Sequence, residues 1–419
     1  MNGKERVRLC LNHEEADHVP IWELGFHNEI ARRLTGRDYL LTVGGGKTVA
    51  NVLKANASGP EARRQIIRRI VNDTMEFYGY MEYDLVRVRP TDFLTPFSFG
   101  SGNWSPNALL DVTIQKIEHD CWKVNHRSGF WSIHKYNEQT QTLADVDDSI
   151  KQGGIEELRR YIETLADQPL DLSIEPIQDA LGGIRQAVEH PAARNIFVLG
   201  WGDVCYPGST AHLAVFLQAM ALEPELVQRY MEVTTPGILA LVRAQSEIGV
   251  DGISGGNDWA FKNGPMFSTR HLRELVAPYL TQIVDETHRC GLKYIKHIDG
   301  DIRKHLPVLV DEVGIDGLHS IEPAANMDIF DLKRQYGDRL TLLGNLDCDL
   351  LARGQAAEIE AQVKLLMEEI APGGGYIFST SNTVLMDVPI ESLQAMLTAA
   401  RRYGVYPINR NSAMNRDTQ

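Results

Sequence analysis

The stretch that decides the fold is LKYIKHIDGDIRKHLPVLVDEVGIDGLHSIEP, residues 292–323. It begins with a short β-forming run, continues through a segment with helical spacing of apolar residues, and ends in a second short run. Gly291 and Gly314 stand where helices are expected to end, because glycine suits the left-handed conformation that closes a helix. A strand, a helix and a strand in this order predict a parallel βαβ unit.

The same rhythm recurs along the chain. Short apolar runs that end in Gly, Asn, Asp, Ser or His are separated by longer helical segments, and they lie at 195–204, 249–258, 292–300, 314–323, 339–348 and 374–383. Two further runs, 18–25 and 83–90, bring the count to eight. Eight such units close into a barrel, whereas fewer would leave an open doubly wound sheet. No Gly-x-Gly-x-x-Gly turn follows the early strands, so we predict an α/β fold, a single (β/α)8 TIM barrel.

The remaining segments are predicted to elaborate this barrel. Residues 30–80 have helical character and form an N-terminal addition. Residues 97–150 alternate β-forming and turn residues, which predicts a β-hairpin insertion within one barrel domain spanning 1–407. Residues 408–419 are a polar tail, expected to fray.

Composition narrows the class of function. The formal net charge is −14 over 419 residues, which gives no basic footprint for nucleic acid. The five cysteines are sparse and form no CxxC pair, which favours a reducing compartment. With no signal-peptide core and no run of about 18 apolar residues, we expect a cytoplasmic protein without a membrane partner. The oligomeric state stays open, with a homo-oligomer as one candidate.

Functional side chains crowd the predicted strand ends, where a parallel barrel gathers its reacting groups. They are Trp22, Glu23, His27, Trp201, Asp203, Tyr206, Asn257, Asp258, Trp259, His297, Asp299, Asp301, His319, Glu322, Asn345, Asp347, Cys348, Ser379, Ser381 and Asn382. Part of this polarity is generic, because Asp, Asn and Ser also cap the helix that follows a strand.

His297 and Cys348 are less easily explained as caps. A histidine, a carboxylate and a thiol at adjacent strand ends could hold a catalytic zinc ion, which takes three protein ligands and leaves one position open. The alternative is a hydrogen-bonded histidine and an inert cysteine.

Asp258, beside Trp259, and Glu322 are the carboxylates that best suit proton transfer, since an aromatic neighbour raises a carboxyl pKa by desolvation. A salt bridge is the alternative for each. Trp22, Trp201, Tyr206 and Trp259 could wall a pocket for a planar ligand, or serve as packing.

Residues 249–354 and 372–407 resemble the uroporphyrinogen decarboxylase superfamily, and the likeness extends over roughly 190–407. The resemblance implies a TIM barrel with its site at the carboxyl-terminal mouth. True decarboxylases grip porphyrinogen carboxylates with an arginine-rich N-terminal segment. The corresponding segment here, PIWELGFHNEIARR, places Glu23 near that position. The resemblance therefore points to the branch of corrinoid-dependent methyltransferases.

Thiol-activating members of that branch bind zinc through His-x-Cys and a later Cys. Carried over, the histidine is His297, the first cysteine position is Asp299, and the second falls at about Ser381, for which Cys348 could substitute. Oxygen ligands make a harder Lewis acid, suited to an ether or alcohol oxygen. The resemblance thus implies an O-demethylase that passes a methyl group from a small methoxylated, aromatic compound to a corrinoid protein.

The predicted roles follow from this reading. Zinc would be held by His297, Asp299 and Cys348, and protons would be handled by Asp258 and Glu322. The predicted substrate contacts are Trp22, Glu23, His27, Trp201, Tyr206, Trp259, Asn345, Ser381 and Asn382. The alternatives are a metal-free decarboxylase of a tetrapyrrole or smaller acid, with Arg87, Arg89 or Lys262 lining the mouth, and a non-catalytic scaffold.

Overall fold

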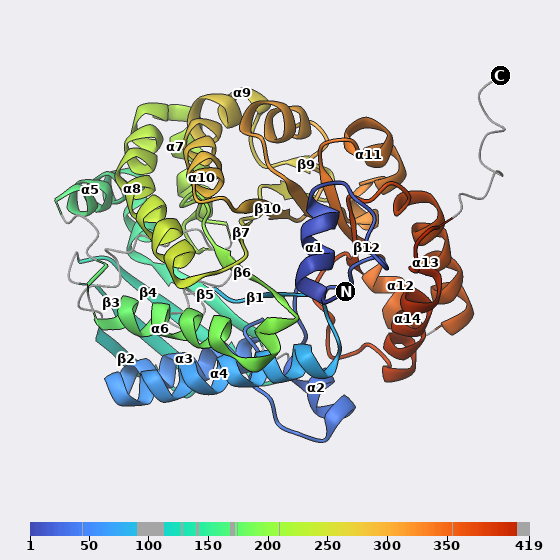
Figure 1. Ribbon diagram of the computed structural model, residues 1–419. Coiled ribbons are helices and arrows are strands. Elements are labelled where there is room, and N and C mark those ends of the chain that lie inside the picture. Colours follow the sequence, from blue (N-terminus) through green and yellow to red (C-terminus); the bar gives the residue numbers. More distant parts are fainter. Residues whose placement is uncertain are drawn as a thin grey trace.

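Parallel strands form the centre of the protein, which we describe from a computed structural model (Figure 1). Seven strands pair in parallel in the order β1-β6-β7-β10-β11-β12-β13. They are β1 (Leu85–Arg87), β6 (Phe197–Trp201), β7 (Gly252–Gly256), β10 (Lys293–Ile298), β11 (Gly317–Ser320), β12 (Thr341–Leu346) and β13 (Tyr376–Thr380). The structure describes residues 1–408 except 44, 90–112, 127–128, 140–141, 168–171, 174, 209 and 354.

An extended segment near the N-terminus takes the eighth place in this sheet. Ile21 pairs in parallel with Phe378 of β13, and the Trp22 N–H donates to the Phe378 carbonyl at 2.9 Å. On its other side, the Asp84 N–H donates to the Ile21 carbonyl at 2.9 Å. The segment therefore lies between β13 and β1, the two edges of the seven-stranded sheet. This confirms the predicted TIM-barrel fold, and the other seven predicted runs contain β1, β6, β7 and β10 to β13.

Helices surround the strands (Figure 1). They are α1 (Gly3–Leu11), α2 (Asn28–Thr35), α3 (Gly46–Ala57), α4 (Pro60–Tyr80), α5 (Ser149–Ala166), α6 (Glu175–Glu189), α7 (Leu213–Leu222), α8 (Pro224–Ile248), α9 (Thr269–His271), α10 (Ala277–Arg289), α11 (Ile329–Tyr336), α12 (Cys348–Arg353), α13 (Ala356–Ile370) and α14 (Ile390–Tyr403). Wide π turns occupy 272–276 and 308–313, and single 3₁₀ turns occupy 191–194 and 323–325. Gly291 (φ 73°) and Gly314 (φ 78°) adopt the left-handed conformation expected after their helices.

The insertion after β1 is larger than the sequence predicted. It forms a four-stranded antiparallel sheet of β2 (Thr113–Glu118), β3 (Cys121–Asn125), β4 (Trp131–Asn137) and β5 (Thr142–Asp148). A single hairpin was therefore the wrong expectation. Residues 131–137 and 142–148 also pair with each other, which adds β4 and β5 to the expected hairpin. Helix α3 contacts β2, β4 and β5 of this sheet, and α5 contacts β5. The start of the predicted insertion, 97–112, and most of the predicted tail, 409–419, lie outside the described residues.

Aspartates open three of the strands at the amino-terminal end of the barrel. Asp84, Asp251 and Asp316 each precede a strand and accept the N–H of the neighbouring strand, at Ile21 (2.7 Å), Val198 (3.0 Å) and Tyr294 (2.8 Å) respectively. Helix α1 lies across this end and contacts β1, β6 and β13. The repeated Asp sets the register of adjacent strands, because its carboxylate bridges one strand start to the next.

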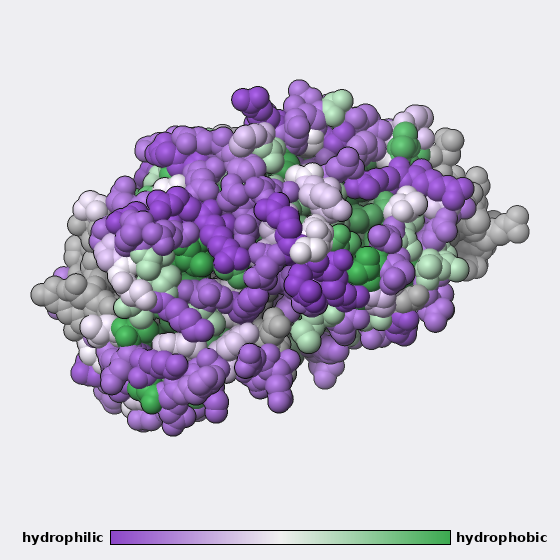
Figure 2. All heavy atoms as spheres, turned by 90° about the horizontal axis from the view of Figure 1, so that it is seen from below, coloured by the Kyte–Doolittle hydropathy of each residue, from purple (hydrophilic) through white to green (hydrophobic). Residues whose placement is uncertain are grey.

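The surface seen in Figure 2 is mostly hydrophilic. Hydrophobic residues form small separate patches on this face. Within the described part of the chain, no helix combines the length and the apolar character needed to cross a membrane.

Candidate metal centre

Three side chains from two neighbouring strands meet at the carboxyl-terminal end of the barrel. His297 lies in β10 opposite Gly256 of β7, Asp299 follows β10 directly, and Asp258 follows β7. One ligand atom from each side chain lies within 4.8 Å of the others. His297 Nε2 is 3.5 Å from Asp299 Oδ1 and 3.9 Å from Asp258 Oδ1. We call Asp258, His297 and Asp299 the triad.

The two carboxylates are held by neighbouring groups. The Asp299 N–H donates to Asp258 Oδ1 at 3.0 Å, and the Asn382 amide donates to Asp299 Oδ2 at 2.8 Å. The other Asp299 oxygen, Oδ1, is buried and makes no hydrogen bond of good geometry within the described residues, although the Ser320 hydroxyl lies near enough to this carboxylate to oppose the rise of its pKa. A buried carboxylate oxygen without such a hydrogen bond is costly, so its position beside His297 suits a bound cation.

Carboxyl groups repel one another at this end of the barrel. Burial and then the Asp299 charge raise the pKa of Asp258 to about 7. Burial also raises the pKa of Asp299, and burial and the Asp299 charge raise the pKa of Glu322. Glu322 sits at the rim, where its Oε2 accepts the Gly300 N–H at 2.8 Å. A divalent cation would relieve this repulsion and favour the charged forms.

His297 is buried and neutral. Its pKa is lowered well below the ordinary value, first by burial and then by the positive charge of Arg87. Its Nδ1 lies 2.8 Å from Nδ1 of His319, whose own pKa is also lowered by burial. A neutral imidazole is the form that binds a metal ion.

Trp201 and Arg87 face the interior of the barrel. Side chains at Gly200 and Gly202 would meet Gln245 and Val242 of α8, so these glycines face outward and Trp201, between them, faces the interior. Arg87 also reaches inward, since a Cβ at Gly256 would lie 3.3 Å from its Nη1. The glycine therefore leaves space for the guanidinium beside β7.

A buried ion pair braces the outer side of the same strands. Lys296 Nζ pairs with the Asp203 carboxylate and lies 4.3 Å above the Trp259 ring. Asp203 Oδ2 also accepts the Gly256 and Asn257 N–H groups, at 2.7 and 3.2 Å. This pair therefore fixes the turn that delivers Asp258. From the sequence we placed Asp203 at a strand end but did not single out Lys296. A charged residue within an otherwise apolar run was the one feature that could have indicated it.

The aromatic residues predicted to hold substrate are all buried. Trp22 packs edge-on against His319 with ring centroids 4.9 Å apart, and faces the interior beside the triad. Trp259 and Tyr206 instead pack with Phe267 in the layer outside the strands. Contact of these rings with a substrate stays a prediction.

Cys348 is not a member of the triad. It begins α12, and its Sγ lies 3.5 Å from Ser381 Oγ, while burial raises the pKa of its thiol to about 11. In the triad, Asp258 takes the third ligand position, which the sequence analysis assigned to Cys348. From the sequence we assigned Asp258 to proton transfer instead. His297 and Asp299 lie in the triad as expected.

The remaining predicted contacts support the local structure. Glu23 is fully buried beneath Thr380, and burial raises its pKa to about 8. His27 caps α2 by accepting the Glu29 N–H at 3.2 Å. Asn345 donates to the Ile321 carbonyl at 2.9 Å.

Comparisons with known proteins agree with this architecture. Residues 202–403 match the uroporphyrinogen decarboxylase family. The uroporphyrinogen decarboxylase of Pseudoalteromonas translucida is 24% identical over 43% of this chain and 49% of its own length. That of Dechloromonas aromatica is 23% identical over 54% of this chain and 64% of its own length. The matched part thus spans about half to two thirds of these curated relatives.

A solved structure shares the fold over nearly the whole chain. A methyltransferase from Methanosarcina mazei is 16% identical, with a TM-score of 0.59, and the match covers 96% of this chain and 99% of that one. At this identity the likeness concerns the fold alone. The family match over residues 202–403 and the low-identity relatives support membership of the uroporphyrinogen decarboxylase superfamily, and the solved structure shows the shared fold.

Proposed function

We propose that this protein is a metal-dependent methyltransferase of the O-demethylase type. It would take a methyl group from a small methoxylated, aromatic compound and pass it to a corrinoid carried by a partner protein. The observation that carries the proposal is the convergence of a neutral imidazole and two carboxylates, one with a buried oxygen that makes no hydrogen bond of good geometry within the described residues. The methyltransferase from Methanosarcina mazei, which shares the fold, supports it as an analogy.

The triad fits a catalytic zinc ion. Asp258, His297 and Asp299 would be three protein ligands of nitrogen and oxygen, which is the number that leaves a position open for a substrate. When bound there, zinc would act as a Lewis acid on the ether oxygen of the donor. With Asp258 in the ligand set, Glu322 becomes the candidate proton donor.

Glu322 suits the proton transfer because of its place and its raised pKa. In the reaction the methyl C–O bond breaks, its electron pair stays on oxygen, and the methyl group passes to the corrinoid. The oxygen must then take up a proton, and a carboxyl at the rim with a raised pKa can supply it. The Gly300 N–H fixes the orientation of this carboxyl.

The interior would orient the rest of the donor. Trp22 and Trp201 are planar groups on the inner side of the barrel, and Arg87 adds positive charge beside β7. A methoxylated ring would pack against the tryptophans with its ether oxygen at the triad. Arg87 would also lower the energy of a negative leaving oxygen.

A decarboxylase is the second candidate. The sequence relatives are decarboxylases, and the buried residues Arg87 and Arg89 at the end of β1 could hold a carboxylate. Both arginines lower the pKa of His297, so they lie close enough to act at the same place. Three carboxyl groups at the mouth would oppose a substrate with many carboxylates.

The test is methyl transfer by the purified, zinc-loaded chain. Methoxybenzoates would be incubated with chemically reduced free cobalamin in place of the partner, following methylcobalamin by absorbance and phenols by mass spectrometry. We expect both products in equal amounts, and their loss in Asp299→Asn. The matched control is Asp349→Asn, since Asp349 is exposed and outside the triad. Release of carbon dioxide from a carboxylate donor without methyl transfer would favour the decarboxylase instead.

A further inference from the structure

Two buried histidine rings stack beside each other at the candidate centre. His297 and His319 are opposite one another in the pairing of β10 with β11. Their ring centroids are 5.0 Å apart, the planes differ by 28°, and their Nδ1 atoms are 2.8 Å apart. At that distance one nitrogen must carry a hydrogen and the other must accept it.

The direction of that hydrogen bond follows from the next contact. His319 Nε2 lies 3.2 Å from the Thr380 carbonyl oxygen, which can only accept. His319 Nε2 therefore carries a hydrogen. A neutral imidazole has only one, so His319 Nδ1 is bare and accepts from Nδ1–H of His297. His297 Nε2 is then left with its lone pair, and this is the atom that faces Asp258 and Asp299.

We infer that His319 is a positioning residue that holds His297 in the Nδ1–H tautomer, with the Nε2 lone pair directed at the two triad carboxylates. A lone pair facing two carboxylates is unfavourable unless a cation or a carboxyl proton lies between them. That consequence for a metal ion rests on the proposed function, whereas the order of hydrogen bonds does not. Trp22 packs on His319 and keeps its ring in place.

The same relay is anchored on the other side by Glu23. Thr380 Oγ1 contacts both the Glu23 carboxyl and the Asn382 carbonyl oxygen, the latter at 2.5 Å. A hydroxyl has one hydrogen, and the carbonyl can only accept it. The hydrogen shared with Glu23 must therefore come from Glu23, which is protonated. The Thr380 N–H donates to Glu23 Oε1 at 3.1 Å, which completes the anchor.

Residues 380–382 thus hold both kinds of triad ligand. The Thr380 carbonyl orients His297 through His319, and the Asn382 amide orients Asp299 directly. Because the end of β13 and the two residues after it carry both contacts, a shift of residues 380–382 would disturb the nitrogen and oxygen ligands together. Outer partners of this kind typically change metal affinity by about 10- to 100-fold.

The first test needs no metal. Long-range proton–nitrogen spectra of the metal-free, full-length protein with ¹⁵N-labelled histidine distinguish the two tautomers, and His297→Gln and His319→Asn assign the signals. We expect Nδ1–H for His297 and Nε2–H for His319. Observation of Nε2–H on His297 would overturn the inference, whether or not the protein binds zinc.

The second test compares zinc affinities by competition with a chelator. His319→Phe keeps a ring but removes the acceptor, and we expect about 10- to 100-fold weaker binding. His319→Asn returns an oxygen acceptor near the Nδ1 position and should recover most of the loss. The matched control is His305→Phe, another buried histidine whose Nε2 contacts a backbone carbonyl, that of Phe267, away from the triad.

The outcomes separate this inference from the proposed function. Wild-type zinc affinity in a folded His319→Phe protein would mean that His319 only packs, and would overturn the positioning role. The expected tautomers in a wild-type protein that binds no zinc would refute the metal chemistry and support the relay.

Discussion

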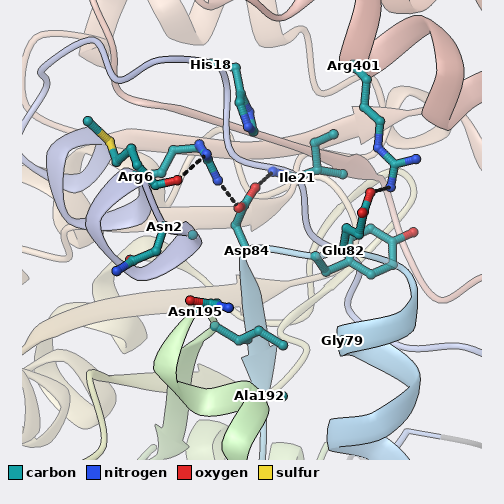
Figure 3. Close-up of a pocket in the computed structure, with 14 residues that line it drawn as sticks. Asn2, Arg6, His18, Ile21, Gly79, Glu82, Asp84, Ala192, Asn195 and Arg401 are labelled. Atoms are coloured by element: carbon teal, nitrogen blue, oxygen red, sulfur yellow. Dashed lines mark hydrogen bonds and ion pairs between the residues drawn. The ribbon is translucent and has the colours of Figure 1, made fainter.

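The two ends of the barrel treat their carboxylates in opposite ways. At the amino-terminal end, Asp84, Asp251 and Asp316 pair with Arg6 (2.5 Å), Lys4 (2.8 Å) and Lys293 (2.8 Å). Figure 3 shows Asp84 between Arg6 and the Ile21 N–H, at the edge of a cavity of about 660 Å³. At the carboxyl-terminal end, no lysine or arginine of the described residues forms an ion pair with Asp258, Asp299 or Glu322.

The contrast separates carboxylates that stabilise the fold from carboxylates that remain available to a ligand. Hydrogen bonds from His288 and Lys293 help lower the pKa of Asp316, although burial opposes them, and burial raises the pKa of Asp84 against the opposing charge of Arg6. At the other end, burial and mutual repulsion both raise the pKa of Asp258 and Glu322. Carboxylates that are satisfied by the protein have no capacity left for a ligand. Those that repel one another are stabilised only when a cation arrives or a proton binds. The mutually repelling carboxylates thus lie at the carboxyl-terminal end of the strands, where parallel barrels have their active sites.

The largest expected effect is at the amino-terminal end. Arg6→Ala removes the cation from buried Asp84, and breaking a buried pair in this way costs about 3–5 kcal/mol of unfolding free energy. Urea unfolding measures it. Arg8→Ala is the control, since Arg8 is 59% exposed and Asp251 keeps Lys4, so its loss should stay below about 1 kcal/mol. Equal losses in the two variants would contradict the assignment of stability to buried pairs.

Glu23 differs from both the paired and the mutually repelling carboxylates, because it is a buried carboxyl group that stays neutral. Its folded pKa is about 8, above the ordinary 4.5, so between these values the folded chain holds a proton that the unfolded chain has lost. Its contribution to stability therefore falls as pH rises through this window, and is constant below it. Glu23→Gln lacks this proton, keeps an NH donor for Thr380, and should gain on the wild type by up to about 1.4 kcal/mol per pH unit.

Urea unfolding of both proteins at pH 5.0, 6.5 and 8.0 would measure the gain of Glu23→Gln. Glu23→Ala is the control, because it removes the anchor of Thr380 and should destabilise at every pH. A difference between Glu23→Gln and the wild type that does not change with pH would show that Glu23 ionises normally, and the hydrogen-bond order at Thr380 would be wrong.

A smaller effect of opposite sign is expected at the triad. Asp258→Asn removes one of the repelling charges but keeps an oxygen for the Asp299 N–H. Because the Asp258 side chain is 36% exposed and solvent screens its charge, we expect the metal-free protein to gain only about 1 kcal/mol at pH 8. The gain should shrink as pH falls from 8 to 5, because below a pKa of about 7 the folded wild type takes up a proton that the unfolded chain binds only near 3.8. A loss of stability at pH 8 would mean that Asp258 is already paired.

Much of the barrel could be predicted from the sequence, because each strand is a short buried run followed by a polar end and a helix. The first strand, 18–25, was also expected, although only isolated pairs form there. The insertion was underestimated, since its strands depend on pairing between segments whose side chains are mostly polar.

Only part of the candidate site could be predicted from the sequence, because some of its contacts depend on how distant strands pair. His297 and Asp299 stand together in HIDGD, so their nearness to one another is local. Asp258 joins them through the register of β7 with β10, and His319 joins through that of β10 with β11. No spacing along the chain encodes these contacts. Cys348 lies two residues after β12, just as Asp258 lies two residues after β7. However, Cys348 begins α12, which turns its thiol toward Ser381.

The most direct measurement of the central claim is zinc content and affinity of the purified protein beside His297→Ala. By plasma mass spectrometry and chelator competition, we predict near-stoichiometric zinc in the wild type and its loss in the variant. Affinity should rise about tenfold per pH unit up to about pH 7, because below the pKa of Asp258 a proton must leave before the ion binds. Absence of zinc from both proteins, or equal zinc in both, would contradict the metal centre described here.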